Sequence, residues 1–450
     1  MNHRILYSIG RQSPRSNTDN LIRSLGSSLL VVPCKTTLPN GIRILSEHVA
    51  AAQSFALGVW IDVGSCDEAA DEHGITHFIE HLAFRGTASP ERTRSSLHIA
   101  YALESVGGYL NAFTTKDHTC YYARALNPHF MRSLELLSDL CQFPVFNSAD
   151  IEKERAIILE EIKSLEDEPE ELINDYMDEQ LFGTGSSAHP YAHPISGTEH
   201  TIRAIQRVDI VRFHQRHYTN NRIIIAVSGN IHHDQLVRQV ERVFSASSLS
   251  QASQRCIPEP QQRTSTIRYE STSAQQTHLS YAALIPYVAN QTYYILAALN
   301  IILGDGMSSR LHQRIREKHG LCYTIYSALS EIRHSAILSI YACFEPEHYD
   351  KVYKLIRTEV TRIAEQPVRT AELRRAKEQL KSSLIMGLES LSGRMTLLAK
   401  SELYTGTFDS VKQKIALIES ISSTDILTLA QCYLQEHYWH TVVLSPRHSP

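Results

Sequence analysis

Two histidines and a glutamate lie within one five-residue string, His77-Phe78-Ile79-Glu80-His81. Positions i and i+4 of a helix stack on one face, so both imidazoles can reach a single metal ion. Glu80 lies on the same side, where it can accept a proton from a water on that ion. Imidazole and carboxylate ligands suit zinc and leave one coordination position open. The string is the inverted form, H-x-x-E-H, of a common zinc-peptidase pattern, and it predicts metal-assisted hydrolysis.

The alternative is a chance surface pairing, because the chain contains 23 histidines. The neighbouring residues argue against it: Ile75, Phe78, Ile79, Leu82 and Phe84 make the helix expected over 74–84 apolar nearly all round. Polar side chains in a buried helix need partners, since burying them unsatisfied is costly. We therefore expect His77, Glu80 and His81 to form part of a metal site.

The two histidines leave such a site one protein ligand short. An acidic helix expected over 149–166 is the best source, and its adjacent Glu160 and Glu161 compete for the role. Helical phase places Glu161 on the apolar side with Ile158 and leaves Glu160 on a more solvated side. Glu161 is therefore the predicted third ligand. Glu154, two turns earlier, is expected to orient one of the histidines.

Composition narrows the class of protein. The chain has 450 residues, 42% of them apolar, and this length suggests two or three domains. Its net charge of −4 gives no reason to expect nucleic acid as a partner. No segment approaches the roughly 20 apolar residues that a membrane-spanning helix needs. The eight cysteines are scattered without a C-x-x-C pair, so they are expected to be reduced rather than metal ligands.

The second half of the chain repeats the element order of the first. A strand expected over 277–286 corresponds to one over 54–63, and a helix over 293–303 corresponds to the one over 74–84. Between the halves lies a segment rich in Ser, Gln and Pro. The predicted fold class is α+β, with two homologous α/β-sandwich half-domains joined by a linker. The expected divisions are an N-terminal extension over 1–36, a catalytic zinc-binding domain over 37–245, a linker over 246–268, and a second domain over 269–450 that completes the active site.

The repeat has a chemical consequence. Aligning Gly86 with Gly304 places three apolar residues of the second copy opposite the three polar residues of the first. A helix that only fills a core would keep the apolar version, so the first copy is expected to carry the chemistry. The paired positions are His77 with Ile295, Glu80 with Ala298, and His81 with Leu299.

With these motifs in view, the sequence resembles the pitrilysin-type (M16) metallopeptidases, which carry the inverted zinc motif. HFIEH is followed by ERAIILEEI (154–162), and other segments occur in family order, among them GGYLNAFTTKDHTCYYA (107–123) and GMSSRLHQRIREKHGLCYTIYS (306–327). Length places it with the small two-domain bacterial and mitochondrial-processing-peptidase-like subfamily. The resemblance implies that the two halves close like a clamshell.

The resemblance also implies substrate contacts. Asn111, Ala112, Phe113 and Thr114 correspond to the family's exposed edge strand, on which an extended peptide adds as one more strand. Arg316 and Tyr323 match the pair that reaches across from the second half, Arg316 to a substrate carbonyl and Tyr323 to the oxyanion. Without the family resemblance, the sequence alone would indicate that Tyr323 is an aromatic residue of a core strand and Arg316 a surface charge.

The predicted function is that of a zinc-dependent endopeptidase acting on peptides or unfolded protein segments in an extended conformation. The alternatives are a processing-peptidase-type catalytic subunit that needs a partner chain, and a non-catalytic peptide-binding or assembly subunit. We expect a homodimer, with a heterodimer as the alternative, and no membrane span. The expected location is a bacterial cytoplasm, or the mitochondrial matrix if the Arg- and Ser-rich residues 1–36 are a transit peptide.

Overall fold

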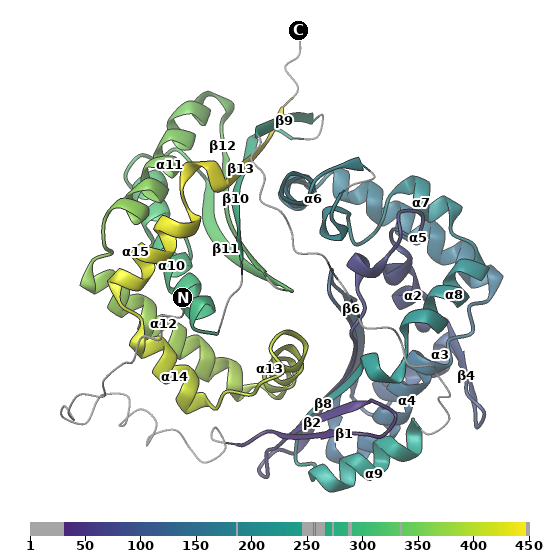
Figure 1. Cartoon of the computed structure of the whole chain (residues 1–450). Helices are drawn as coiled ribbons and strands as arrows, with labels where there is room; N and C mark the ends of the chain where they lie inside the picture. The colour runs from purple at the N-terminus through teal and green to yellow at the C-terminus, as the bar shows by residue number, and fades with distance from the viewer. Residues whose placement is uncertain are drawn as a thin grey trace, which may run out of the picture.

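A computed structural model describes residues 31–185, 188–244, 255, 257, 266–271, 274–286, 290–333 and 335–446. Two mixed sheets, each covered by helices, face one another (Figure 1). This arrangement confirms the predicted α+β fold with two similar halves. Expectations that concern residues 1–30, including a transit peptide, fall outside the described residues.

The first half is built on a six-stranded sheet in the order β1-β2-β8-β3-β7-β6. Its strands are β1 (Cys34–Thr37), β2 (Arg43–His48), β3 (Ser54–Ile61), β6 (Tyr109–Thr114), β7 (Thr119–Leu126) and β8 (Ile223–Gly229), and a small hairpin pairs β4 (Gly86–Ala88) with β5 (Thr93–Ser95). Its helices are α2 (Ile75–Ala83), α3 (Ser96–Glu104), α4 (Phe130–Gln142), α5 (Ser148–Glu166), α6 (Pro169–Phe182), α7 (Glu199–Ala204), α8 (Arg207–His217) and α9 (His233–Val243).

The second half is built on a five-stranded sheet in the order β11-β12-β10-β13-β9. Its strands are β9 (Thr266–Ser271), β10 (Thr277–Pro286), β11 (Thr324–Ile332), β12 (Ser335–Phe344) and β13 (Trp439–Pro446). Its helices are α10 (Asn290–Leu303), a π-helical segment (His312–Glu317), α11 (Tyr349–Glu365), α12 (Thr370–Glu389), α13 (Leu391–Tyr404), α14 (Val411–Ser420) and α15 (Ser423–Tyr433).

The two sheets share one pairing scheme. In each, a central strand (β3 or β10) pairs antiparallel with two neighbours. One neighbour pairs antiparallel with an edge strand, β6 or β11, and the other pairs parallel with an earlier strand, β2 or β9. The internal repeat expected from element order is therefore present in the topology of the two sheets. Among the described residues, the first sheet has one more strand than the second, β1 at its edge.

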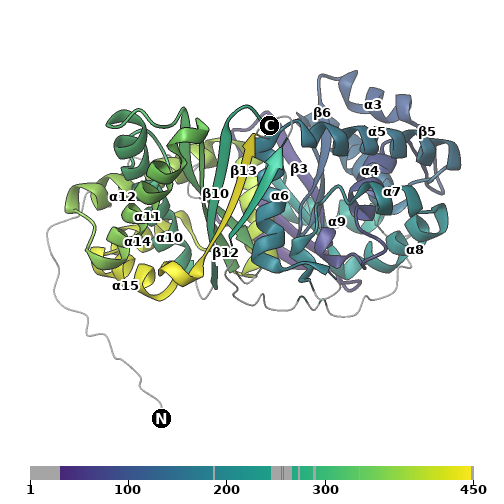
Figure 2. The same ribbon diagram turned by 90° about the horizontal axis from the view of Figure 1, so that it is seen from above.

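The halves are held together by a reciprocal exchange of helices. Helix α6 of the first half packs on the second sheet, where Ile173, Met177 and Leu181 join its buried residues (Figure 2). Helix α13 of the second half packs on the first sheet through side chains such as Leu398 and Leu403. Fully burying one such side chain contributes about 1.5–3 kcal/mol. Each sheet thus depends on the opposite half to cover one of its faces.

Polar contacts supplement this apolar interface. A buried ion pair joins Arg394 of α13 to Glu47 of β2 at 2.9 Å. Arg333, between β11 and β12, pairs with Asp62, and its backbone N–H donates to the Asp117 carboxylate at 3.1 Å. Buried charges are costly to leave unpaired, so these contacts favour one relative placement of the halves.

Two expected boundaries fall close to observed elements. Strand β1 begins at Cys34, so the first sheet takes in the last residues of the segment expected to be an extension. Its hairpin with β2 turns at Asn40-Gly41, where Gly41 has a φ of +95°. The linker expected over 246–268 lies mostly outside the described residues, and its last three residues belong to β9.

Within the described residues, no helix combines the length and apolar character needed to cross a membrane.

A buried histidine predicts a pH-dependent stability. His214 of α8 donates a hydrogen bond from Nε2 to the Cys141 carbonyl at 2.8 Å, and burial lowers the pKa of His214 to about 4. The unfolded chain, with a histidine pKa of about 6.5, binds more protons below that pH, so this contribution is lost as pH falls. Between pH 7.5 and 5.5 the expected loss is about 1.3 kcal/mol.

Urea unfolding of the zinc-free protein at these two pH values checks this expectation. His214→Gln keeps an amide donor for the carbonyl but does not titrate, so its stability should fall less with acidification. An identical pH dependence in both proteins would remove His214 as a contributor.

Candidate metal centre

Helix α2 carries the metal motif, and a buried carboxylate caps its first turn. Gly74 precedes the helix with a φ of +92°, a conformation that favours glycine. The Glu68 side chain accepts hydrogen bonds from the backbone N–H groups of Gly74 and Thr76 at 2.8 and 2.9 Å. Burial raises the pKa of Glu68 to about 8. The predicted helix is therefore confirmed. The capping role of Glu68 was not predicted, because no sequence pattern links it to Gly74, six residues later.

The apolar side chains of α2 enter the core, as their spacing predicts. Ile75, Phe78, Ile79 and Leu82 are all at most 1% exposed. The three polar side chains of the motif are half-buried. Because the core fixes the rotation of the helix, it also fixes the direction in which the histidines point.

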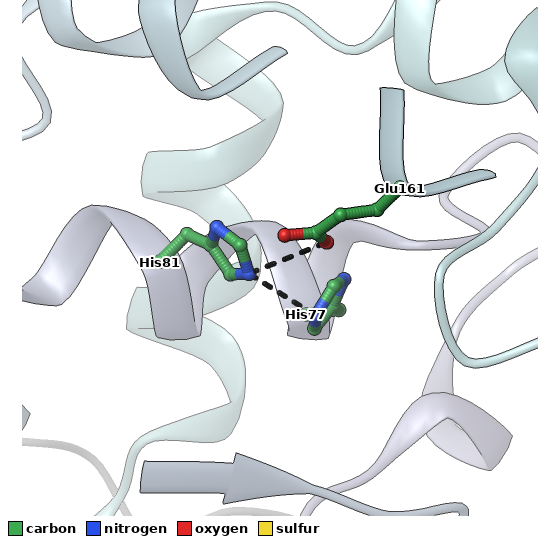
Figure 3. Close-up of side chains that lie close together, drawn as sticks. All are labelled: His77, His81 and Glu161. Atoms are coloured by element: carbon green, nitrogen blue, oxygen red, sulfur yellow. Dashed lines mark hydrogen bonds and ion pairs between the residues drawn. The ribbon is translucent and has the colours of Figure 1, made fainter. Parts of the chain in front are cut away.

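His77, His81 and Glu161 come together at one point (Figure 3). The Nε2 atoms of the two histidines are 3.2 Å apart, and the His81 Nε2 lies 3.8 Å from a Glu161 carboxylate oxygen. One potential ligand atom from each residue lies within 4.8 Å of the others. Among the described residues, this is the one group of at least three such side chains with that spacing.

The spacing fits a tetrahedral zinc ion. Zinc–nitrogen bonds of about 2.0–2.1 Å place two ligand nitrogens about 3.3 Å apart, close to the observed separation. Burial, with a smaller effect of the neighbouring His81, lowers the pKa of His77 to about 4, so its ring is neutral at pH 7. A neutral imidazole is the form that binds metals.

The two adjacent glutamates point in different directions. Glu161 faces the histidines, whereas Glu160 points to solvent, with its side chain 75% exposed and paired with Lys163 at 3.1 Å. Helical phase predicted this difference. Glu161 is itself 46% exposed at the side chain, so the group opens toward solvent on that side.

Glu80 lies beside the edge strand rather than on the metal group. Its carboxylate accepts a hydrogen bond of 2.5 Å from the Thr114 hydroxyl at the end of β6. Burial raises the pKa of Glu80, and the Thr114 hydrogen bond partly counteracts it. Thr114, expected as a substrate contact, therefore also contacts the expected base.

A second set of contacts lies behind His81. Its Nδ1 is 3.0 Å from a carboxylate oxygen of Glu154, as expected for an orienting residue. The other oxygen of Glu154 forms an ion pair with Arg85. Arg85 was not predicted from the sequence, because its contact with Glu154 depends on how α5 packs beside α2.

The predicted residues of the second half lie next to each other. The Arg316 guanidinium lies over the Tyr323 ring at 5.8 Å, and the Tyr323 side chain is 75% exposed rather than in the core. In the described part of the chain, no hydrogen bond or ion pair joins either residue to His77, His81 or Glu161. Their part in the site stays a prediction.

The expected peptide-binding segment occupies a sheet edge. Strand β6, which contains Asn111, Ala112, Phe113 and Thr114, pairs with β7 on one side and ends the first sheet. Its other side has no strand partner among the described residues. Backbone groups at such an edge can pair with an added strand.

Comparison with known protein families gives two matches along the chain. The model described as "Insulinase (Peptidase family M16)" matches residues 43–195. The model described as "Peptidase M16 inactive domain" matches residues 204–380. In the second half, the positions expected opposite the metal motif are indeed apolar, with Ala298 and Leu299 fully buried.

Comparison with individual proteins gives relatives of nearly the same length. A Mycobacterium leprae protein named as an uncharacterized zinc protease is 36% identical over 418 residues, covering 91% of each chain. A Bacillus subtilis protein of the same description is 32% identical over 402 residues, covering 89% of this chain and 96% of its own. A crystal structure of a Helicobacter pylori protease has a TM-score of 0.84 at 22% identity, covering 93% of this chain and all of its own.

Proposed function

This chain belongs to peptidase family M16, and on that premise we propose that it is a zinc-dependent endopeptidase that cleaves peptides or unfolded protein segments in an extended conformation. The observation that carries the proposal is the convergence of His77, His81 and Glu161, with Glu80 beside the free edge of β6. The names of the zinc-protease relatives support the choice of metal.

Each residue of the site has a separate task. His77, His81 and Glu161 would hold zinc, which when bound supplies Lewis-acid polarisation and lowers the pKa of a coordinated water. Glu80 accepts a proton from the attacking water and returns it to the nitrogen of the leaving amine. The raised pKa of Glu80 suits this double use, because a stronger base accepts the proton more readily.

Substrate binding is assigned to both halves. A peptide that pairs with Asn111, Ala112 and Phe113 through its backbone would bind with little dependence on its side chains, and it would pass close to Glu80. Arg316 would hold a substrate carbonyl, and Tyr323 would donate to the developing oxyanion. In this assignment the catalytic domain is the first half and the second half completes the active site.

The test uses the purified full-length chain and a pool of quenched random peptides. We expect cleavage that is lost with a zinc chelator and restored when zinc is added back. Size-exclusion chromatography of the same sample reports whether the active species contains only this chain. Absence of cleavage by the zinc-loaded chain would overturn the proposal. Cleavage only after a second chain is added would favour the processing-peptidase alternative, and peptide binding without cleavage would favour the assembly subunit.

A further inference from the structure

The buried carboxylate of Glu154 contacts two side chains, a hydrogen-bonded histidine and an ion-paired arginine. Its side chain is 3% exposed and reaches from α5 to the last turn of α2. One oxygen lies 3.0 Å from His81 Nδ1, and the other pairs with the Arg85 guanidinium. A neutral histidine supplies a directed N–H but no charge. Arg85 therefore supplies the positive charge that this buried carboxylate requires.

The orientation of Glu154 matters for the metal group. When Nδ1 of a histidine donates to a carboxylate, the lone pair of the ring is left on Nε2. In His81, Nε2 is the atom that faces His77 and Glu161. A carboxylate free to rotate would no longer hold the ring in this direction.

The cation next to Glu154 in sequence does not take this role. Arg155, next to Glu154 in sequence, donates to the backbone carbonyls of Ile202 and Ile205 and pairs with Glu152. Arg85 follows the end of α2, where its backbone N–H bonds to the Leu82 carbonyl at 3.0 Å. This turn places its side chain, 35% exposed, against Glu154.

We propose that Arg85 is a positioning residue of the metal centre, which holds Glu154 so that His81 presents Nε2 to zinc. The proposal rests on the proposed zinc site and adds a residue outside the ligand set. Substituting a residue that orients a metal-binding histidine typically lowers metal affinity by about 10–100-fold.

The experiment measures zinc affinity by competition with a chromophoric chelator, without any peptide substrate. Arg85→Gln is expected to weaken zinc binding by at least about 10-fold, and Arg85→Lys to restore most of it, because lysine keeps the charge. The visible spectrum of the cobalt-loaded protein should change in Arg85→Gln and return toward wild type in Arg85→Lys.

Arg94→Gln is the matched control. Arg94 pairs with Asp139 at 3.0 Å in the same half, with side chains that are 15% and 9% exposed. Its loss should lower thermal stability but leave zinc affinity and the cobalt spectrum unchanged. Wild-type zinc affinity in Arg85→Gln, or an equal loss in Arg94→Gln, would overturn the proposal. Zinc binding by the wild type without peptide cleavage would count against the proposed function alone, because affinity is measured separately.

Discussion

Replacing Glu80 with glutamine is expected to reduce kcat/KM for peptide cleavage by about 10²–10⁴-fold, the range of general acid–base catalysis. The amide has nearly the same shape, and its oxygen can still accept the hydrogen bond from Thr114. It cannot accept a proton from water at neutral pH. Zinc affinity should stay within about threefold of wild type, because Glu80 lies outside the group formed by His77, His81 and Glu161.

Peptide cleavage and chelator competition, measured on the same preparation, separate an effect on catalysis from an effect on zinc affinity. Glu199→Gln is a suitable control, since Glu199 forms an exposed surface pair with Arg203. Retention of more than a tenth of wild-type activity in Glu80→Gln would exclude Glu80 as the base. Loss of zinc from the variant would instead indicate that Glu80 contributes to the metal group.

Local periodicity predicted the helix that carries the motif and the closeness of its two histidines, because helix geometry alone determines both. The i, i+4 spacing of His77 and His81 requires only that 75–83 be helical, and the apolar residues between them fix which way the helix faces. The same reasoning separated Glu161 from Glu160, because adjacent residues on a helix differ by about 100° in direction.

The residues that sequence reasoning missed depend on contacts between distant segments. Glu68 caps α2 from the preceding loop, and Arg85 meets Glu154 only because α5 packs beside α2. Neither contact follows from a period or a spacing within one element. The burial of one face of each sheet under a helix of the other half, α6 or α13, was also unpredicted, since an amphipathic helix does not specify which sheet it covers.

The repeated topology explains how one half can specialise. Both halves share the same strand pairing, although the second half lacks the polar residues of the metal motif. In the second copy, Ala298 and Leu299 fill the core. In the first, the open side of α2 carries His77 and His81, and the surrounding carboxylates make their partial burial tolerable.

Removal of the Glu161 carboxylate is expected to weaken zinc binding more than loss of an orienting residue does, by over about 100-fold. Glu161→Ala leaves two imidazoles on one face of α2, which is too few protein ligands for a stable zinc site. Glu160→Ala is a closely matched control, because it removes the same side chain from the next position, where it pairs only with Lys163 among the described ion pairs.

Thermal unfolding with and without zinc gives an independent measure. Zinc at 100 times its dissociation constant should stabilise the wild type by about 2.7 kcal/mol, and the same concentration should have almost no effect on Glu161→Ala. Glu160→Ala should respond as the wild type does. If the two variants lose zinc equally, the assignment of Glu161 rather than Glu160 as the third ligand is wrong. If Glu160→Ala alone loses it, α5 would have to rotate by about 100° when the metal binds, which its buried Ile158 and Glu154 oppose.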